Sequence, residues 1–284
     1  MRLALRPTRV PGSAPQRLAL VRLLLGLHLL VWALVDIPHL VTLYGTPVFS
    51  AGWIARTLLS LVTRDQLIAL VVGALILGAV GLVVGVARRP AAVLCFVADT
   101  LLLELDPAIR SPELPLIRLL LLVLVLLPVA EPRWWRTTPP TPMTTTWSRH
   151  LRGASIVVWG ALVVGMSIAG LSKITSGDPA WASGTAMAVL LAQSAWVRPA
   201  VAAALATLPA VVLLVVGFGA VAVEVGSVVV VLRSLRWPWW LASSCMHLGA
   251  LLLFAIPQVS AGMLIVHLFL TVDDALLVGS PSSR

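Results

Sequence analysis

The sequence predicts an all-α, polytopic membrane protein with about eight transmembrane helices. Of its 284 residues, 60% are hydrophobic and only 11% are charged, and the mean hydropathy is +1.03. Several apolar stretches approach or exceed the ~18 residues that a membrane-spanning helix needs. None of them alternates polar and apolar positions as the strands of a barrel do. Helices satisfy their own backbone hydrogen bonds in hydrocarbon, so the composition indicates a bundle of helices.

The first half of the transmembrane domain follows a basic, proline-containing tail, residues 1–17, and is expected to hold four spans. These spans are residues 18–43, 67–87, 91–105 and 116–130. The first span carries Arg22, His28 and Asp36, which is unusual for a simple anchor. The segment between the first two spans, residues 45–65, is interpreted as a connection that includes a surface-lying helix.

Two short segments are expected to mark boundaries between spans in this half. Arg88-Arg89-Pro90 is expected to end the second span, because proline does not continue a helix. Residues 106–115 are expected to form a tight polar turn between the third and fourth spans.

A Pro/Thr-rich segment, residues 131–152, predicts an irregular cytoplasmic linker between two halves, residues 18–130 and 153–276. The second half is expected to hold four more spans, followed by a C-terminal tail, residues 277–284. These spans are residues 154–171, 207–232, 238–256 and 260–276. Residues 180–197, flanked by Trp181 and Trp196, are interpreted as a re-entrant or interfacial helix.

The distribution of cationic side chains predicts the orientation. In the eight-span arrangement, thirteen Lys and Arg residues fall on the side of the N-terminus and five on the opposite side. Cytoplasmic loops carry the excess of such residues, so both termini are expected in the cytoplasm and Lys173 on the extracytoplasmic side. The expected location is a bacterial-type plasma (inner) membrane.

The sequence argues against nucleic-acid binding, a metal site and the common nucleotide-binding or hydrolase motifs. The net charge of +9 comes from arginines scattered at helix ends, which argues against nucleic-acid binding. Cys95 and Cys245 fall inside apolar stretches and are interpreted as packing residues. His247 and His267 lie on different spans without a companion at helical spacing, so no metal site is predicted. Nucleotide-binding and common hydrolase motifs do not occur.

Lys173 is the main candidate for chemistry, since it is the only lysine in the chain and the other cations are arginines. A buried lysine can lose its proton and act as a base, whereas arginine cannot. The alternative is that Lys173 anchors a helix end at the bilayer surface.

Acidic residues within the spans are further candidates, because charges in hydrocarbon need a partner or a polar cavity. Glu104 and Arg118 are candidates for a structural ion pair across the turn between the third and fourth spans. Glu224 has no cation within its own helix and is therefore the better functional candidate. Together with Lys173, the residues Asp36, Glu104 and Arg118 and the neighbours of Glu224 at the same depth could line one polar cavity that opens outward.

The order of four short patterns resembles the HTTM family, the membrane domain related to vitamin K-dependent gamma-carboxylase. The patterns are the arginine-led first helix L-A-L-V-R-L-L-L-G-L, the helix-turn-helix that begins L-L-L-E-L-D-P, A-G-L-S-K-I followed by W-A-S-G-T-A-M, and a Glu-bearing helix before C-M-H-L-G-A. The resemblance implies that Lys173 is a catalytic base and that Trp181, Gly184 and His247 contribute to a cofactor site. The implied cofactor is a quinone or naphthoquinone.

Two departures separate this chain from the carboxylase. The turn that carries an Asn-His pair in the carboxylase reads R-S-P-E-L here, and little chain follows the last span, where the carboxylase has a region that binds protein substrate. Carboxylation of a docked polypeptide is therefore not expected.

Three functions stay open at this point. The first is a carboxylase-like enzyme that uses Lys173 on a lipid-soluble cofactor or an extracytoplasmic substrate. The second is a non-catalytic membrane protein for maturation, export or immunity of a secreted peptide. The third is a quinone-associated membrane protein similar to the DoxX group.

Overall fold

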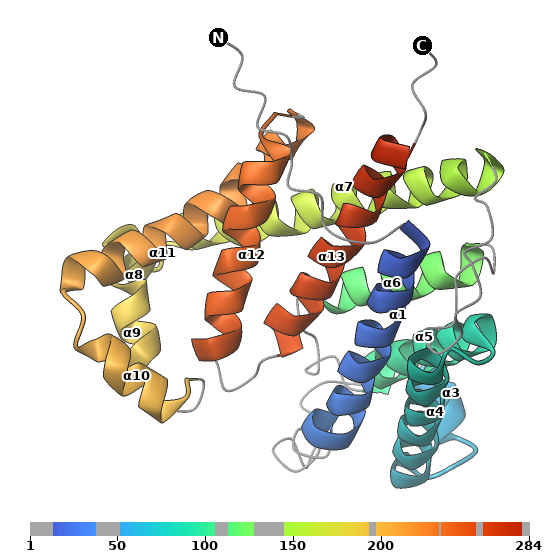
Figure 1. The fold of residues 1–284 in the computed structure, drawn as a ribbon. Coiled ribbons are helices and arrows are strands. Elements are labelled where there is room, and N and C mark those ends of the chain that lie inside the picture. The colour runs from blue at the N-terminus through green and yellow to red at the C-terminus, as the bar shows by residue number, and fades with distance from the viewer. Residues whose placement is uncertain are drawn as a thin grey trace, which may run out of the picture. The chain divides into compact units, whose positions relative to one another are not determined.

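The computed structural model describes residues 14–37, 52–105, 113–127, 145–192, 197–232, 234–253 and 258–279 (Figure 1). In these ranges the chain is almost entirely helical and forms no strand, so the all-α prediction is confirmed for them. The chain divides into two compact units. Unit 1 holds the described residues of Trp159–His267, and unit 2 holds those of Gly12–Val158 and Leu268–Arg284.

Unit 2 contains the helices of the first half of the chain, the first part of α7 and the C-terminal part of α13 (Gln258–Gly279), from Leu268 on. Its elements are α1 (Ala14–Val31), the π-helical turn η1 (Trp32–Asp36), α3 (Trp53–Leu59), α4 (Arg64–Val84), α5 (Arg88–Leu105), α6 (Leu114–Leu126) and the start of α7 (Thr145–Thr175). Helix α4 packs against α1 and α5, and α5 also packs against α6 and α3.

Small residues bring these helices close together. A Cβ added at Gly78 of α4 would lie 2.7 Å from Sγ of Cys95 on α5. A Cβ at Gly26 of α1 would lie 2.9 Å from the carbonyl oxygen of Ala79 on α4. Glycine at such positions lets backbones approach, which is the usual way in which helices pack inside a membrane.

The boundary between α4 and α5 differs from the prediction. Helix α4 ends at Val84, and Gly85 caps it in the left-handed conformation with φ 72°. Arg88-Arg89-Pro90 therefore opens α5 instead of ending the preceding helix. Proline fits the first turn of a helix because its missing N–H would have no partner there. The two arginines donate to the carbonyl of Leu127, at 2.9 and 3.1 Å.

The predicted linker is shorter than expected at its C-terminal end. Helix α7 starts at Thr145, so residues 145–152 are helical and not irregular. The last proline of the linker is Pro142, and nothing after it interrupts a helix. The rest of the linker lies outside the described residues.

Unit 1 contains the C-terminal part of α7 and the helices that follow it. These are α8 (Pro179–Ala182), α9 (Ala186–Ala192), α10 (Pro199–Ala206), α11 (Ala210–Val225), the 3-10 helix η3 (Gly226–Val231), α12 (Arg236–Leu253) and the first part of α13 (Gln258–Gly279). Helix α11 packs against α9 and α12.

The predicted re-entrant helix over residues 180–197 is not continuous. The chain forms the short helices α8 and α9 there, interrupted at Gly184, whose φ of 76° is left-handed. That conformation is open to glycine but not to a continuing helix. Trp196, which was expected to flank this helix, lies outside the described residues.

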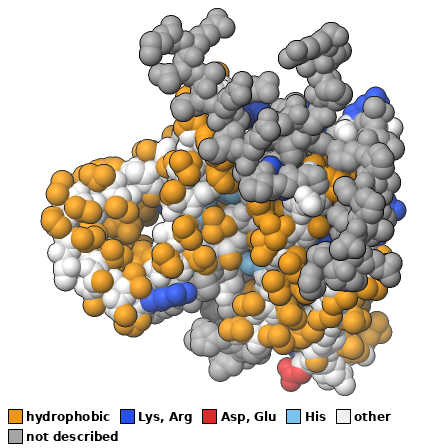
Figure 2. All heavy atoms as spheres, in the orientation of Figure 1, with side chains coloured by type: hydrophobic (Ala, Val, Ile, Leu, Met, Phe, Trp, Pro, Cys, Tyr) orange, Lys and Arg blue, Asp and Glu red, His pale blue; other side chains and the backbone are white. Residues whose placement is uncertain are grey.

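Within the described ranges, four helical stretches are long and apolar enough to cross a membrane. They are Ala14–Val35, Arg64–Val84, Thr146–Thr175 and Ala210–Val230. Leu114–Leu126 and Gln258–Thr271 are shorter apolar helices. Large apolar side chains are widely exposed, among them Leu77 at 67% and Val211 at 63%, and hydrophobic side chains cover much of the visible face in Figure 2. An apolar surface of this kind suits contact with lipid and indicates a membrane-integral protein.

Candidate functional site

The end of α7 positions Lys173. The residue lies in the last turn of the helix, where a cation is favoured by the helix dipole. The backbone N–H of Ser176 donates to the carbonyl of Ser172 at 2.8 Å, and Gly177 follows with φ 71°. A left-handed glycine directly after a helix reverses the chain, so the long helix stops just beyond Lys173.

Gly170 allows α7 to approach α11 closely beside this lysine. A Cβ at Gly170 would lie 2.7 Å from the backbone nitrogen of Val225 and 2.8 Å from Cβ of Glu224. Nearby, the hydroxyls of Ser167 and Ser227 lie 2.8 Å apart, and Ser227 also donates to a carbonyl of α7 at 3.1 Å. These contacts fix the register of α7 and α11 and place Glu224 opposite Lys173.

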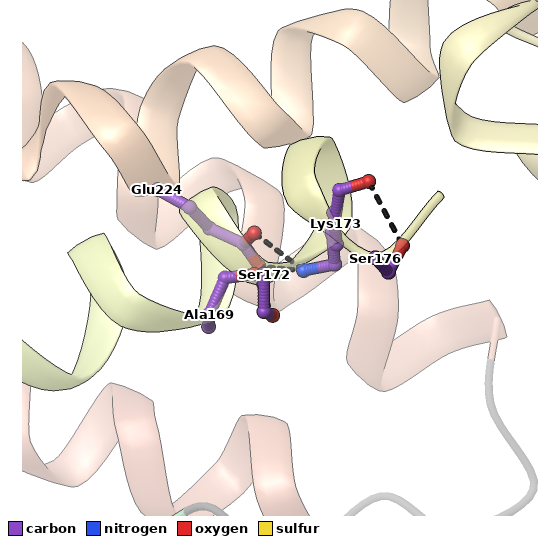
Figure 3. A network of polar contacts seen from close by, with 5 residues as sticks. All are labelled: Ala169, Ser172, Lys173, Ser176 and Glu224. Carbon is purple, nitrogen blue, oxygen red and sulfur yellow. Dashed lines mark hydrogen bonds and ion pairs between the residues drawn. The ribbon is translucent and has the colours of Figure 1, made fainter. Parts of the chain in front are cut away.

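Lys173 and Glu224 form an ion pair between the two helices. The ammonium donates to both carboxylate oxygens, and the Nζ–Oε1 distance is 2.5 Å. Figure 3 shows the two side chains pointing toward each other from their helices. The side chain of Lys173 is 26% exposed and that of Glu224 is 12% exposed. The two leading candidates are thus brought together, in a pair that is neither fully buried nor fully solvated.

Trp181 lies beside the ammonium, with 5.3 Å between Nζ of Lys173 and the centre of the indole ring. An aromatic face at this distance attracts a cation. The turn that places the indole is capped by Asp178, whose Oδ1 accepts from the N–H of Ala180 at 2.8 Å, and Pro179 occupies the first helical position. Asp and Pro are favoured at these two positions.

Gly184 has a packing role in the structure. Besides its left-handed φ, a Cβ there would lie 2.8 Å from Phe218 and 3.0 Å from Leu214. Both neighbours are on α11, so glycine is required where the turn after α8 meets α11. This local requirement accounts for Gly184 without a cofactor.

His247 lies on α12, buried against a second histidine. Its ring packs edge-to-face on the ring of His267, with 5.5 Å between the centres. Its Nε2 has no hydrogen-bond partner in the described part of the chain. His247 lies in unit 1, which also contains the ion pair.

Arg118 takes a different partner from the one that the sequence suggested. It pairs with Asp99 on α5, not with Glu104, and also donates to the carbonyl of Asp99 at 3.3 Å. Glu104 lies against Gly52, and its Oε2 is buried without a hydrogen-bond partner among the described residues. Asp99 is five residues before Glu104, so the two carboxylates leave α5 in different directions, and only Asp99 meets Arg118.

The candidates for one shared cavity fall into separate units. Lys173 and Glu224 are in unit 1, whereas Glu104 and Arg118 are in unit 2. The side chain of Asp36 lies outside the described residues. The shared cavity stays a prediction.

Sequence reasoning also missed a polar contact between α12 and α13. Ser243 Oγ lies 2.8 Å from Nε2 of His267, and both residues are buried. The spacing of Ser243 and His247, four residues apart, places both on one face of a helix and was the signal that could have revealed this cluster.

Among the described residues, no group of three or more His, Cys, Asp or Glu side chains could hold a metal ion. No protein-family model, curated protein or solved structure matches this chain.

Proposed function

We propose that this protein is a multi-pass membrane protein of the carboxylase-like (HTTM) type that carries out acid–base chemistry on a lipid-soluble molecule. The observation that supports this proposal is the Lys173–Glu224 ion pair with Trp181 beside it. Charged groups within spans mark proton and substrate pathways more often than they mark simple anchors. An anchoring lysine would extend to the headgroups and would not bind a carboxylate on a neighbouring span.

The chemistry belongs to the pair and not to Lys173 alone. In the ion pair the ammonium has no lone pair, so it cannot accept a proton. Moving one proton over the 2.5 Å from Nζ to Oε1 of Glu224 gives a neutral amine and a neutral acid. The amine can then take a proton from a bound weak acid, while Trp181 offers a flat apolar surface to the ligand. A quinone or naphthoquinone in its reduced form fits this chemistry.

We further propose eight spans, formed by α1 with η1, α4, α5, α6, α7, α11 with η3, α12 and α13. Both termini are then cytoplasmic in a bacterial-type inner membrane, and Lys173 is extracytoplasmic. Single cysteines at Ser176 and Thr145, in a chain without Cys95 and Cys245, should react with impermeant thiol reagents from opposite sides of the membrane. Labelling from the same side contradicts this arrangement.

Lipid-soluble molecules that copurify with the protein test the proposal. Mass spectrometry should find a quinone-type molecule enriched with the wild-type protein and reduced about tenfold with Lys173→Met, which corresponds to a loss of about 1.4 kcal/mol in binding. Arg56→Gln is the control, because this arginine is exposed on α3. Equal amounts with wild type and Lys173→Met contradict the proposal.

Lys173→Arg separates chemistry from charge. Arginine keeps the positive charge and the partner Glu224 but does not release a proton. We expect this variant to retain bound ligand and to lose the acceleration of air oxidation of reduced menadione, followed by absorbance. A variant that keeps the wild-type rate assigns only a binding role to Lys173.

A further inference from the structure

Helices α12 and α13 share a serine–histidine contact that the Lys173–Glu224 pair does not use. Ser243 Oγ lies 2.8 Å from Nε2 of His267, and Nδ1 of the same ring lies 2.7 Å from the carbonyl oxygen of Met263. A carbonyl oxygen only accepts, so Nδ1 carries the ring proton, and Nε2 of the neutral ring accepts from the serine hydroxyl. Ser243 thus donates to a base whose tautomer is set by a third group.

Two tryptophans of α12 hold the imidazole of His267 in place. Trp239 stacks on it, with 5.8 Å between ring centres and 18° between planes. Trp240 Nε1 donates to the backbone carbonyl of His267 at 3.0 Å. Trp239 is itself fixed by donating to the carbonyl of Val223 at 2.9 Å. A nucleophile, a base within hydrogen-bond reach and a group that orients the base are the parts of an activated serine.

His247 adds a free polar group beside this pair. It lies one helical turn after Ser243 on α12, its side chain is 7% exposed, and its Nε2 has no hydrogen-bond partner in the described ranges. A buried polar nitrogen without a partner is unfavourable unless a ligand completes it. In the tautomer with a proton on Nε2, it can donate to a developing negative charge.

We propose that Ser243, His267 and His247 form a second catalytic site, of the serine-hydrolase type, which cleaves a lipid-soluble carboxylic ester. Ser243 Oγ forms a bond to the ester carbonyl carbon while its proton moves to Nε2 of His267. His247 donates to the carbonyl oxygen as this oxygen becomes negative. The bond to the alcohol oxygen then breaks, and that oxygen takes the proton from His267.

Water completes the reaction. A water molecule attacks the acyl carbon and gives a proton to His267, and Ser243 Oγ leaves and recovers that proton. The net change is one ester and one water converted into one carboxylic acid and one alcohol, without oxidation or reduction. Because Ser243 and His267 are buried in apolar helices, the substrate has to be an uncharged molecule that partitions into the bilayer. This site goes beyond the proposed function and does not depend on Lys173.

Covalent labelling tests the nucleophile. The full-length protein in lipid nanodiscs is treated with a fluorophosphonate probe, and mass spectrometry locates the adduct. We expect the adduct on Ser243, formed at least about tenfold more slowly in His267→Gln and absent in Ser243→Ala. Ser244→Ala is the matched control, because this neighbouring serine points to another side of α12 and should leave labelling unchanged.

Labelling of the wild-type chain decides the outcome even where a variant does not fold. Absence of an adduct on Ser243, under conditions that label another intramembrane serine hydrolase, overturns the proposal. An adduct on Ser244 instead of Ser243 overturns it as well.

Hydrolysis of p-nitrophenyl octanoate tests the substrate class. We expect release of p-nitrophenolate by wild type and by the exposed control Arg56→Gln alike, and none by Ser243→Ala. His247→Phe keeps an aromatic ring but removes the donor, and it should lower kcat about 10²-fold with little change in KM. Cleavage of an octanoyl anilide but not of the ester contradicts an ester substrate.

Discussion

Each unit contains a cation–carboxylate pair among its described residues, and these two pairs differ in depth and in the helices that they join. Asp99 and Arg118 in unit 2 lie on the consecutive helices α5 and α6, and the Asp99 side chain is completely buried. Lys173 and Glu224 in unit 1 come from α7 and α11, and both side chains keep some exposure. The first pair ties neighbouring helices, whereas the second brings together distant parts of the chain and remains accessible to a ligand.

The helices that carry the two pairs also differ in burial, with α5 more buried than α11. Helix α5 buries Asp99 together with residues along its length, from Ala91 to Leu105. In α11 only Gly217 is buried. We infer that the Asp99–Arg118 pair serves stability and that the Lys173–Glu224 pair serves chemistry.

Breaking the pair in unit 2 should give the largest effect on stability. Arg118→Leu leaves the carboxylate of Asp99 buried without its cation, and we expect a loss of about 3–5 kcal/mol in the free energy of unfolding. Denaturation by sodium dodecyl sulfate in mixed micelles measures it. The double variant Asp99→Leu with Arg118→Leu should recover most of the loss, because no unpaired charge remains. If Arg118→Leu loses less unfolding free energy than the exposed control Arg56→Gln, the Asp99–Arg118 pair does not stabilise the fold.

Disturbing the close packing of α7 on α11 should give the second-largest loss of stability. Gly170→Ala places a Cβ 2.7 Å from the backbone nitrogen of Val225, which cannot move aside as a flexible side chain does. We expect a loss of about 1–3 kcal/mol. Gly165→Ala is the matched control on the same helix: nothing lies within 4 Å of its added Cβ, so it should leave stability unchanged or raise it. Equal melting temperatures for the two variants contradict the close approach.

Removing the pair in unit 1 should cost less than removing the pair in unit 2. For Lys173→Met and Glu224→Gln we expect losses of about 1–2 kcal/mol each, between the values for exposed and buried pairs. The same micelle denaturation measures them. If Lys173→Met destabilises the protein as much as Arg118→Leu, the two pairs contribute equally to stability. This result contradicts the inferred difference between their roles.

The smallest effect concerns helix starts. Thr63 caps α4 in a reciprocal capping box with Gln66, and Thr63→Ala should cost about 1 kcal/mol. Asp178 caps the four-residue helix α8, so Asp178→Ala should cost less than Thr63→Ala. It should nevertheless change the fluorescence of Trp181, measured against Trp181→Phe, since the cap places that indole. If Asp178→Ala leaves the fluorescence contribution of Trp181 unchanged, the cap does not position this indole.

Much of the fold could be predicted because hydrophobicity is a local property. Apolar length indicated helices at α1, α4, α7 and α11, and these same stretches are long enough to cross a bilayer. Boundaries were less predictable. Arg88-Arg89-Pro90 suits the end of one helix and the start of the next equally well, and the left-handed Gly85 placed it at the start of α5. Gly184 likewise divided a stretch that composition alone presents as one helix.

The sequence by itself determined that this chain is helical and apolar enough for a membrane, and it singled out Lys173 and Glu224 as unusual charges there. Only the tertiary structure decided which charges meet. Arg118 follows several acidic residues along the chain, and the directions in which Asp99 and Glu104 leave α5 selected Asp99 over Glu104. Lys173 and Glu224 are 51 residues apart, and the pairing of Ser243 with His267 likewise joins two helices. Such contacts depend on helix register, which is set by packing at positions such as Gly170 and is not encoded in the local pattern around either partner.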